Sequence, residues 1–96
     1  MNRDEMLKFL RESHRIVAES YKAEVQGIFG SYARGEEKPG SDVDVLVEFK
    51  EGASLFDLVD LADFLEENFQ RTVDIVSTRA LRKELEPSVR RDLVRV

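Results

Sequence analysis

Residues 30–49 read "GSYARGEEKPGSDVDVLVEF", and this stretch decides the fold that the sequence predicts. Its last eight residues, "DVDVLVEF", alternate as a β-strand does, because successive side chains of a strand point to opposite faces of the sheet. Valines occupy every second position, so Asp42 and Asp44 share the other face. Because a carboxylate is costly to bury without a positive partner, two aspartates at the head of an apolar strand need an explanation beyond folding.

The segments on either side of this strand alternate between helical and strand-like patterns. In chain order the periodicity predicts a helix over 4–21, a strand over 23–31, a helical turn over 31–36, an exposed loop over 36–41, the strand over 42–49, a helix over 54–69, a strand over 71–77 and one or two short helices over 78–96. This pattern predicts a single α/β (α+β) domain over residues 1–96, in which helices pack on a small mixed β-sheet.

The helix over 54–69 has the clearest apolar stripe of the chain. Ser54 and Asp57 resemble a capping box, with Asp in place of the usual Glu. The stripe that we expect to be buried consists of Leu55, Leu58, Val59, Ala62, Leu65 and Phe69. Further on, Pro87 predicts an interruption between helices, and we expect the last residues to fray or to add an edge strand.

Composition excludes several classes of protein. The chain has no cysteine, so disulfides and thiolate metal sites are excluded, and a reducing, cytoplasmic location is expected. Its apolar runs are too short for a membrane span, and the N-terminal segment lacks the apolar core of a signal peptide. A formal net charge of -5 argues against a large nucleic-acid footprint but leaves room for a small anion bound through a metal ion.

A third acidic residue, Asp74, lies within the strand over 71–77. If this strand neighbours the one over 42–49, Asp74 approaches Asp42 and Asp44, and three close carboxylates raise one another's pKa. A divalent cation removes that repulsion, and an all-oxygen, aspartate-rich set suits magnesium or manganese. The alternative is that Asp42 is a turn residue while Asp44 and Asp74 occupy exposed sheet positions.

Gly30 and Ser31 stand where the first strand gives way to a helical turn. Such a junction directs free backbone N–H groups outward, glycine lets a phosphate approach closely, and the serine hydroxyl adds a donor. Arg34 is a candidate for a charge-assisted bond to a phosphate. The alternatives are an ordinary helix cap and an arginine that pairs with Glu36 or Glu37. A phosphate site beside a metal-binding carboxylate cluster indicates a nucleoside triphosphate bound with magnesium.

Gly30-Ser31, ten intervening residues and then Asp42-Val43-Asp44 form the signature of the DNA-polymerase-β-like nucleotidyltransferase superfamily. From residue 23 onward the chain closely resembles the minimal nucleotidyltransferase (MNT) family. The resemblance implies that Asp42, Asp44 and Asp74 are catalytic and bind magnesium, with Asp74 helping to activate the acceptor hydroxyl. It implies that Gly30 and Ser31 bind the β- and γ-phosphates of ATP. All three aspartates of the pattern are present.

The resemblance also implies a partner, because MNT proteins commonly act as antitoxins of HEPN ribonuclease toxins. AMP would pass from ATP to a toxin tyrosine and block its ribonuclease site. The alternative is a non-catalytic antitoxin that neutralises the toxin by binding and occlusion; transfer to a small molecule is a weaker alternative, since no substrate-binding domain is present. For the same reason we expect base selectivity to be loose or assisted by the partner.

Candidate partner contacts are the loop over 36–40 and a basic C-terminal set. The alternative, which we favour for each, is plain solvent-facing charge. The basic set consists of Arg79, Arg82, Lys83, Arg90 and Arg91. His14 falls on the polar side of the first helix, and we assign it no role.

Overall fold

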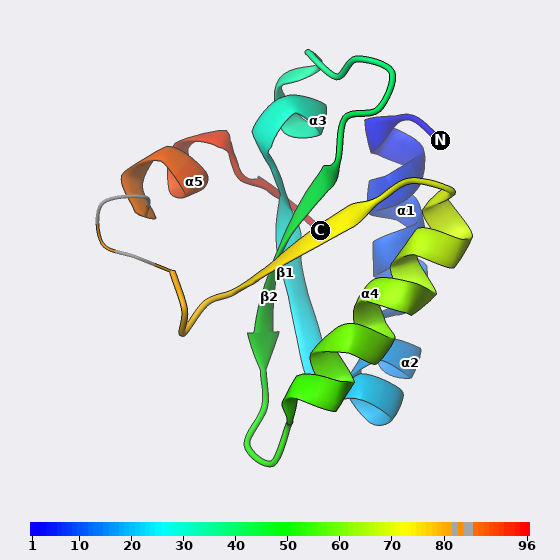
Figure 1. Ribbon diagram of the computed structural model, residues 1–96, viewed down its shortest axis with the longest axis vertical. Coiled ribbons are helices and arrows are strands. Elements are labelled where there is room, and N and C mark those ends of the chain that lie inside the picture. The colour runs from blue at the N-terminus through cyan, green and yellow to red at the C-terminus, as the bar shows by residue number, and fades with distance from the viewer. Residues whose placement is uncertain (82, 84–85) are drawn as a thin grey trace.

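The computed structural model describes residues 1–81, 83 and 86–96 of the chain (Figure 1). The helices are α1 (Arg3–Glu12), α2 (His14–Tyr21), α3 (Gly30–Arg34), α4 (Leu55–Phe69) and α5 (Glu86–Asp92). The strands are β1 (Ala23–Phe29), β2 (Val43–Phe49), β3 (Val73–Ser77) and β4 (Val94–Arg95). This mixed α/β architecture confirms the fold class that the sequence predicts.

The described strands form one mixed sheet in the order β3-β2-β1-β4. β1 runs antiparallel to both β2 and β4, whereas β2 and β3 are parallel, as expected for strands joined through a crossover helix, here α4. The register sets Phe29 of β1 opposite Asp44 of β2, and Asp44 opposite Asp74 of β3. The condition set in the sequence analysis, that the strands carrying Asp44 and Asp74 are neighbours, is therefore met.

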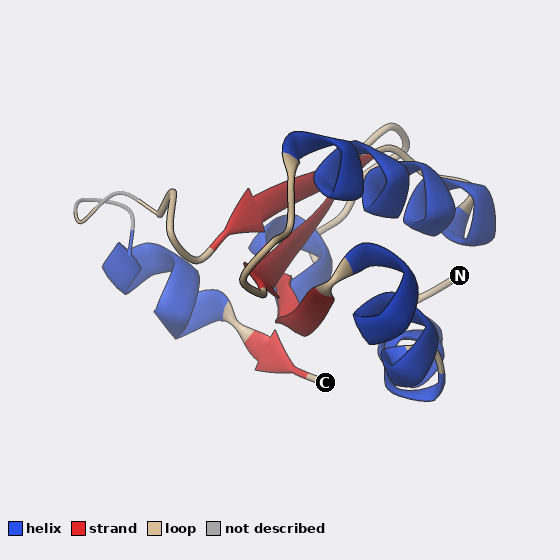
Figure 2. Ribbon diagram, turned by 90° about the horizontal axis from the view of Figure 1, so that it is seen from below, coloured by secondary structure: helices blue, strands red, loops and turns tan. Residues whose placement is uncertain are grey.

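Helices cover the two faces of the sheet unequally. Figures 1 and 2 show α1, α2 and α4 gathered on one side of the sheet, with α5 on the other. The larger core lies under α1, α2 and α4, where Val43, Val45 and Val47 of β2 are fully buried. Leu46 points to the opposite face and is only 1% exposed, so the sheet is packed on both sides near its centre.

The sequence predicts one N-terminal helix over 4–21, but the structure has two, α1 and α2. The prediction of a single continuous helix is therefore wrong. The chain breaks at Ser13, whose side chain is buried and whose hydroxyl donates to the carbonyl oxygen of Phe9 at 2.7 Å. A serine that bonds to the backbone carbonyl four residues earlier favours bending of the helix. Both α1 and α2 contact β1.

The capping box of α4 is confirmed, but its predicted buried stripe is partly wrong. The carboxylate of Asp57 accepts the backbone N–H of Ser54 at 2.8 Å. Leu65 and Phe69 are buried as expected, together with Leu61. The side chains of Leu58 and Ala62 are only half-buried. Leu55 is 74% and Val59 is 47% exposed, because the helix turns its Leu61–Leu65–Phe69 side toward the sheet.

The C-terminal segment also differs from expectation. Pro87, where the sequence predicts an interruption between helices, lies in the first turn of α5, where a residue without an N–H is tolerated. The expected edge strand forms as β4, paired with Gly27 and Ile28 of β1. Among the residues that the structure describes, no helix combines the length and the apolar character needed to cross a membrane.

Candidate functional site

The candidate site is a row of side chains across three strands. Asp44 and Asp74 are each the second residue of their strand, and they face each other in the parallel register of β2 and β3. Paired residues of neighbouring strands lie about 5 Å apart and point to the same face of the sheet. Phe29 continues the row on β1, while Asp42 is exposed just before β2. The structure thus pairs Asp44 with Asp74, two of the three aspartates that the sequence singled out.

The electrostatics of this row centre on Asp44, which is half-buried, whereas Asp42 and Asp74 are exposed. Burial first, and then the neighbouring charges of Asp74 and Asp42, together raise the pKa of Asp44 to about 6. The positive charge of Arg34 opposes this rise. The ionised form of Asp44 is therefore destabilised near neutral pH, both by desolvation and by like-charge repulsion.

Gly30 lies against this carboxylate at the start of α3. Its φ of +75° is in the left-handed region that glycine adopts readily. A Cβ added at Gly30 would overlap the Oδ2 atom of Asp44 and stand 3.2 Å from its Cγ. No larger residue fits here without moving the carboxylate. Ser31 follows at the same junction and is half-buried.

Arg34 is engaged by two carboxylates. Its Nη1 donates to Oδ2 of Asp92 at 2.7 Å, and its Nε donates to Oε2 of Glu36 at 3.3 Å. These bonds, that to Asp92 first, raise the pKa of Arg34. The Glu36 pairing is one of the alternatives that the sequence left open. Asp92, 58 residues away, was not foreseen, and its pairing ties α5 to α3.

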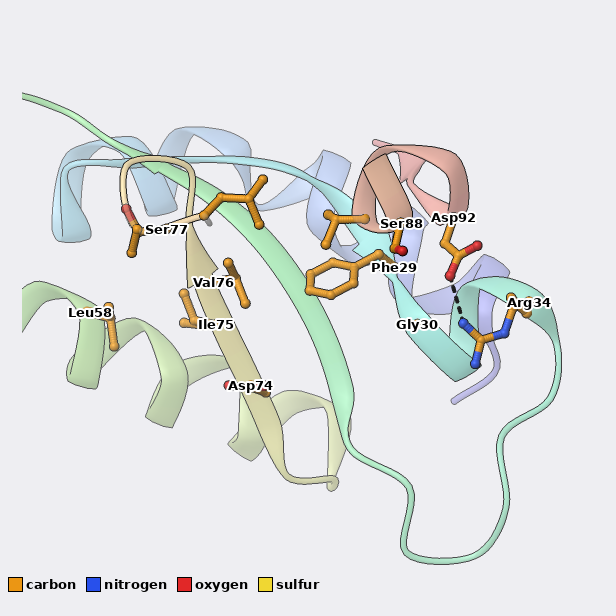
Figure 3. Close-up of a pocket in the computed structure, with 13 residues that line it drawn as sticks. Phe29, Gly30, Arg34, Leu58, Asp74, Ile75, Val76, Ser77, Ser88 and Asp92 are labelled. Atoms are coloured by element: carbon orange, nitrogen blue, oxygen red, sulfur yellow. Dashed lines mark hydrogen bonds and ion pairs between the residues drawn. The ribbon is translucent and has the colours of Figure 1, made fainter. Parts of the chain in front are cut away.

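A cleft of about 570 Å³ opens between β3 and α5, next to the row (Figure 3). Gly30, Arg34 and Asp74 stand among its lining residues, so it adjoins the predicted site. Its walls are mainly apolar, and they include Phe29, Ile75, Val76, Leu81 and Val89. Sequence reasoning missed this cleft; the only signal was the pair of apolar residues in "VDIVS" after Asp74.

The remaining candidates lie on the surface. The residues over 36–40 are exposed, and so are His14 and the described basic residues Arg79, Lys83, Arg90 and Arg91. Arg90 Nε pairs with Oε1 of Glu86 one turn away at 3.1 Å, which is a local helix contact. Arg82 lies outside the described residues.

The donor set of the row fits a hard divalent cation, because carboxylate oxygens are the ligands that magnesium prefers. The pKa of Asp44 is raised first by burial and then by repulsion from Asp74 and Asp42, and a bound cation would offset both effects. Over residues 1–81, 83 and 86–96, no group of three or more acidic or histidine side chains is arranged so that it could hold a metal ion. Magnesium binding by Asp42, Asp44 and Asp74 therefore stays a prediction.

Comparison with known proteins gives consistent matches. Residues 4–95 match the nucleotidyltransferase domain family. A protein adenylyltransferase, MntA, of Thermococcus cleftensis is 36% identical over 93 residues, which are 97% of this chain and 94% of the relative. A solved structure of a proposed minimal nucleotidyltransferase has a TM-score of 0.76 and 36% identity, covering 100% of this chain and 97% of that one. A toxin–antitoxin crystal structure with AMP-PNP has a TM-score of 0.65 and 26% identity, covering 93% and 67%.

Proposed function

Because this chain belongs to the nucleotidyltransferase domain family and is an adenylyltransferase, we propose that it transfers AMP from ATP to a tyrosine hydroxyl of a partner HEPN ribonuclease toxin, in a magnesium-dependent reaction. The chain thereby acts as the antitoxin of that toxin. The observation that carries the proposal is the Asp44–Asp74 register pair beside Gly30. We place the reaction in the cytoplasm, where ATP is available.

In this proposal Asp42, Asp44 and Asp74 hold magnesium. When bound, the ion neutralises phosphate charge and stabilises the entering and departing oxygens of an in-line displacement. The half-burial of Asp44 limits its exposure to water, and its strand fixes the direction of the carboxylate. Gly30 leaves space at the junction, and we assign to Gly30 and Ser31 the orientation of the β- and γ-phosphates. Arg34 donates through Nη1 to Asp92 and through Nε to Glu36, and we assign its other N–H donors to phosphate binding.

The chemistry then needs one bond to form and one to break. The phenolic oxygen of the acceptor forms a bond to the α-phosphorus of ATP, and the bond from that phosphorus to the bridging oxygen breaks. Pyrophosphate leaves with the electron pair. Asp74 is exposed at the edge of the row, so we assign to its carboxylate the acceptance of the phenolic proton.

Two arguments support a HEPN toxin as the partner. The resemblance to the MNT family implies it, and the chain shares its fold with one component of a solved toxin–antitoxin pair that was crystallised with AMP-PNP. The alternative is neutralisation by binding and occlusion alone. That alternative needs an interface but makes no use of the carboxylate row.

The test is transfer to the partner. The chain is incubated with magnesium, ATP labelled on its α-phosphate and the purified toxin, and covalently bound label is measured on the toxin. We expect label with the wild type and with Asp60→Ala, a control aspartate exposed on α4. We expect none with Asp42→Ala or Asp44→Ala. If both site variants still neutralise the ribonuclease fully, occlusion is the function and the proposal is wrong.

A further inference from the structure

We propose that the cleft between β3 and α5 binds the nucleoside of the nucleotide, with the ring of Phe29 as the surface on which the base stacks. The inference deepens the proposed function and rests on it. It also changes an expectation from the sequence, since the contact with the base would come from this chain and not from a partner or a further domain.

The first argument is continuity with the phosphate-binding end of the site. Phe29 directly precedes Gly30 in the chain, and both residues line the cleft together with Asp74. In the sheet register Phe29 stands next to Asp44 on the same face. A base is joined to its phosphates through one sugar, so its pocket must begin beside the residues that hold those phosphates. The cleft meets this requirement.

The second argument is size and chemistry. A volume of about 570 Å³ falls within the range of small-molecule sites, roughly 300 to 1,000 Å³. Ile75 and Val76 form an apolar wall from β3, and Val89 contributes from α5. Figure 3 shows the Phe29 ring projecting into the cleft, with the hydroxyl of Ser88 close by on α5. An aromatic surface with a few polar groups is what a planar heterocycle and its ribose require.

The third argument is that the α5 wall is held in place. The ion pair of Arg34 with Asp92 joins α3 to α5 at 2.7 Å, and both residues lie at the cleft. Val89, which also lines the cleft, is buried, so α5 packs against the fold at this point. These contacts hold the α5 wall of the cleft in place.

The other occupant to consider is the acceptor tyrosine. An acceptor on a folded toxin can insert only one side chain, while its backbone stays outside. The cleft extends from Gly30 along β3 to Ser77, which is more than one phenol ring needs. Its size thus favours a nucleoside over an acceptor side chain.

The experiment compares two ligands, AMP-PNP and inorganic tripolyphosphate, each with magnesium, by isothermal titration calorimetry. Phe29→Leu removes the stacking surface, and Ser88→Trp fills the cleft from an exposed position of α5. The matched controls are Phe56→Leu on α4 and Ser20→Trp on α2, both at exposed positions outside the cleft. Thermal denaturation of every variant checks that it is folded.

We expect the wild type to bind AMP-PNP more tightly than tripolyphosphate. Phe29→Leu and Ser88→Trp should weaken AMP-PNP binding about tenfold to a hundredfold, the range expected for a lost base–aromatic stack. Tripolyphosphate binding should not change in these variants, and the controls should match the wild type for both ligands.

Unchanged AMP-PNP affinity in both cleft variants would overturn the inference while leaving the proposed function intact. If Phe29→Leu and Ser88→Trp left AMP-PNP affinity unchanged but raised the KM for the toxin, the cleft would be the acceptor site. That result would likewise overturn the inference. If the wild type bound neither ligand, the proposed function would fail and the inference with it.

Discussion

Replacing Asp44 by Asn should stabilise the protein in the absence of metal. The side chain keeps its shape, so the contact with Gly30 is retained, but the charge that desolvation and Asp74 disfavour is removed. A rise from 3.8 to about 6 is about two pKa units, or about 3 kcal/mol at most at 1.36 kcal/mol per unit. Because Asp44 is only half-buried, solvent screening reduces this to about 1 to 2 kcal/mol.

The sign of the pH dependence follows from the raised pKa. The folded state binds the Asp44 proton more tightly than the unfolded state, so this group destabilises the fold progressively as the pH rises from about 4 to about 6. The difference between Asp44→Asn and the wild type should therefore be small near pH 4 and complete by about pH 7. At that pH the melting temperature of the variant should be roughly 4 to 16 °C higher, given about 4 to 8 °C per kcal/mol for a domain of this size.

The assay is thermal or urea denaturation of both proteins in a chelator between pH 4 and pH 8, followed by the same series with magnesium. Added magnesium should stabilise the wild type, since a ligand that binds only the native state raises its stability. It should have little effect on the variant. A variant that is less stable than the wild type at pH 7.5 in chelator would show that the Asp44 carboxylate is a structural group, and the reasoning would be refuted.

Two further substitutions test the local geometry. Gly30→Ala should lower the free energy of unfolding by about 1 to 3 kcal/mol and abolish adenylyl transfer, because it adds overlap with Asp44 to the backbone cost of a positive φ. The control is Gly35→Ala, at a φ of +72° with open space around it. This variant should show only the backbone cost in urea denaturation and should retain adenylyl transfer. Equal losses of stability in the two variants would argue against the Asp44 contact. On α4, Leu65→Ala should cost about 2 to 5 kcal/mol and Leu55→Ala under about 0.5 kcal/mol, and the reverse order in denaturation would contradict the observed helix orientation.

The strand over 42–49 was predictable because of the period-two pattern of "DVDVLVEF", which leaves only one face for Asp42 and Asp44. The adjacency of β2 and β3 also follows from elementary rules, since a strand–helix–strand segment of this length commonly forms a parallel pair. The register that sets Asp44 opposite Asp74 needed the structure. The roles of these residues as ligands come from family resemblance.

The orientation of α4 was not predictable from its own sequence. The helix has apolar residues on more of its circumference than one face can bury, so several orientations satisfy its pattern equally. Contacts with other elements select among them, including those with α1, where the Phe9 ring centroid lies 5.8 Å from that of Phe64 and 5.6 Å from that of Phe69. The Arg34–Asp92 pair escaped prediction for a similar reason, because it joins short helices far apart in the chain.

The energetics of Asp44 bear on the choice between catalysis and occlusion. A domain of this size has a total free energy of unfolding on the order of 5 to 15 kcal/mol. A carboxylate that destabilises the fold by about 1 to 2 kcal/mol at neutral pH therefore removes a substantial fraction of that stability. A protein that acts only by covering its partner would fold better with Asn at this position. The charge is compensated once a divalent cation bridges Asp44 to a nucleotide. The placement of Asp44, half-buried and opposite Asp74, therefore favours an active catalytic site over a purely occlusive antitoxin.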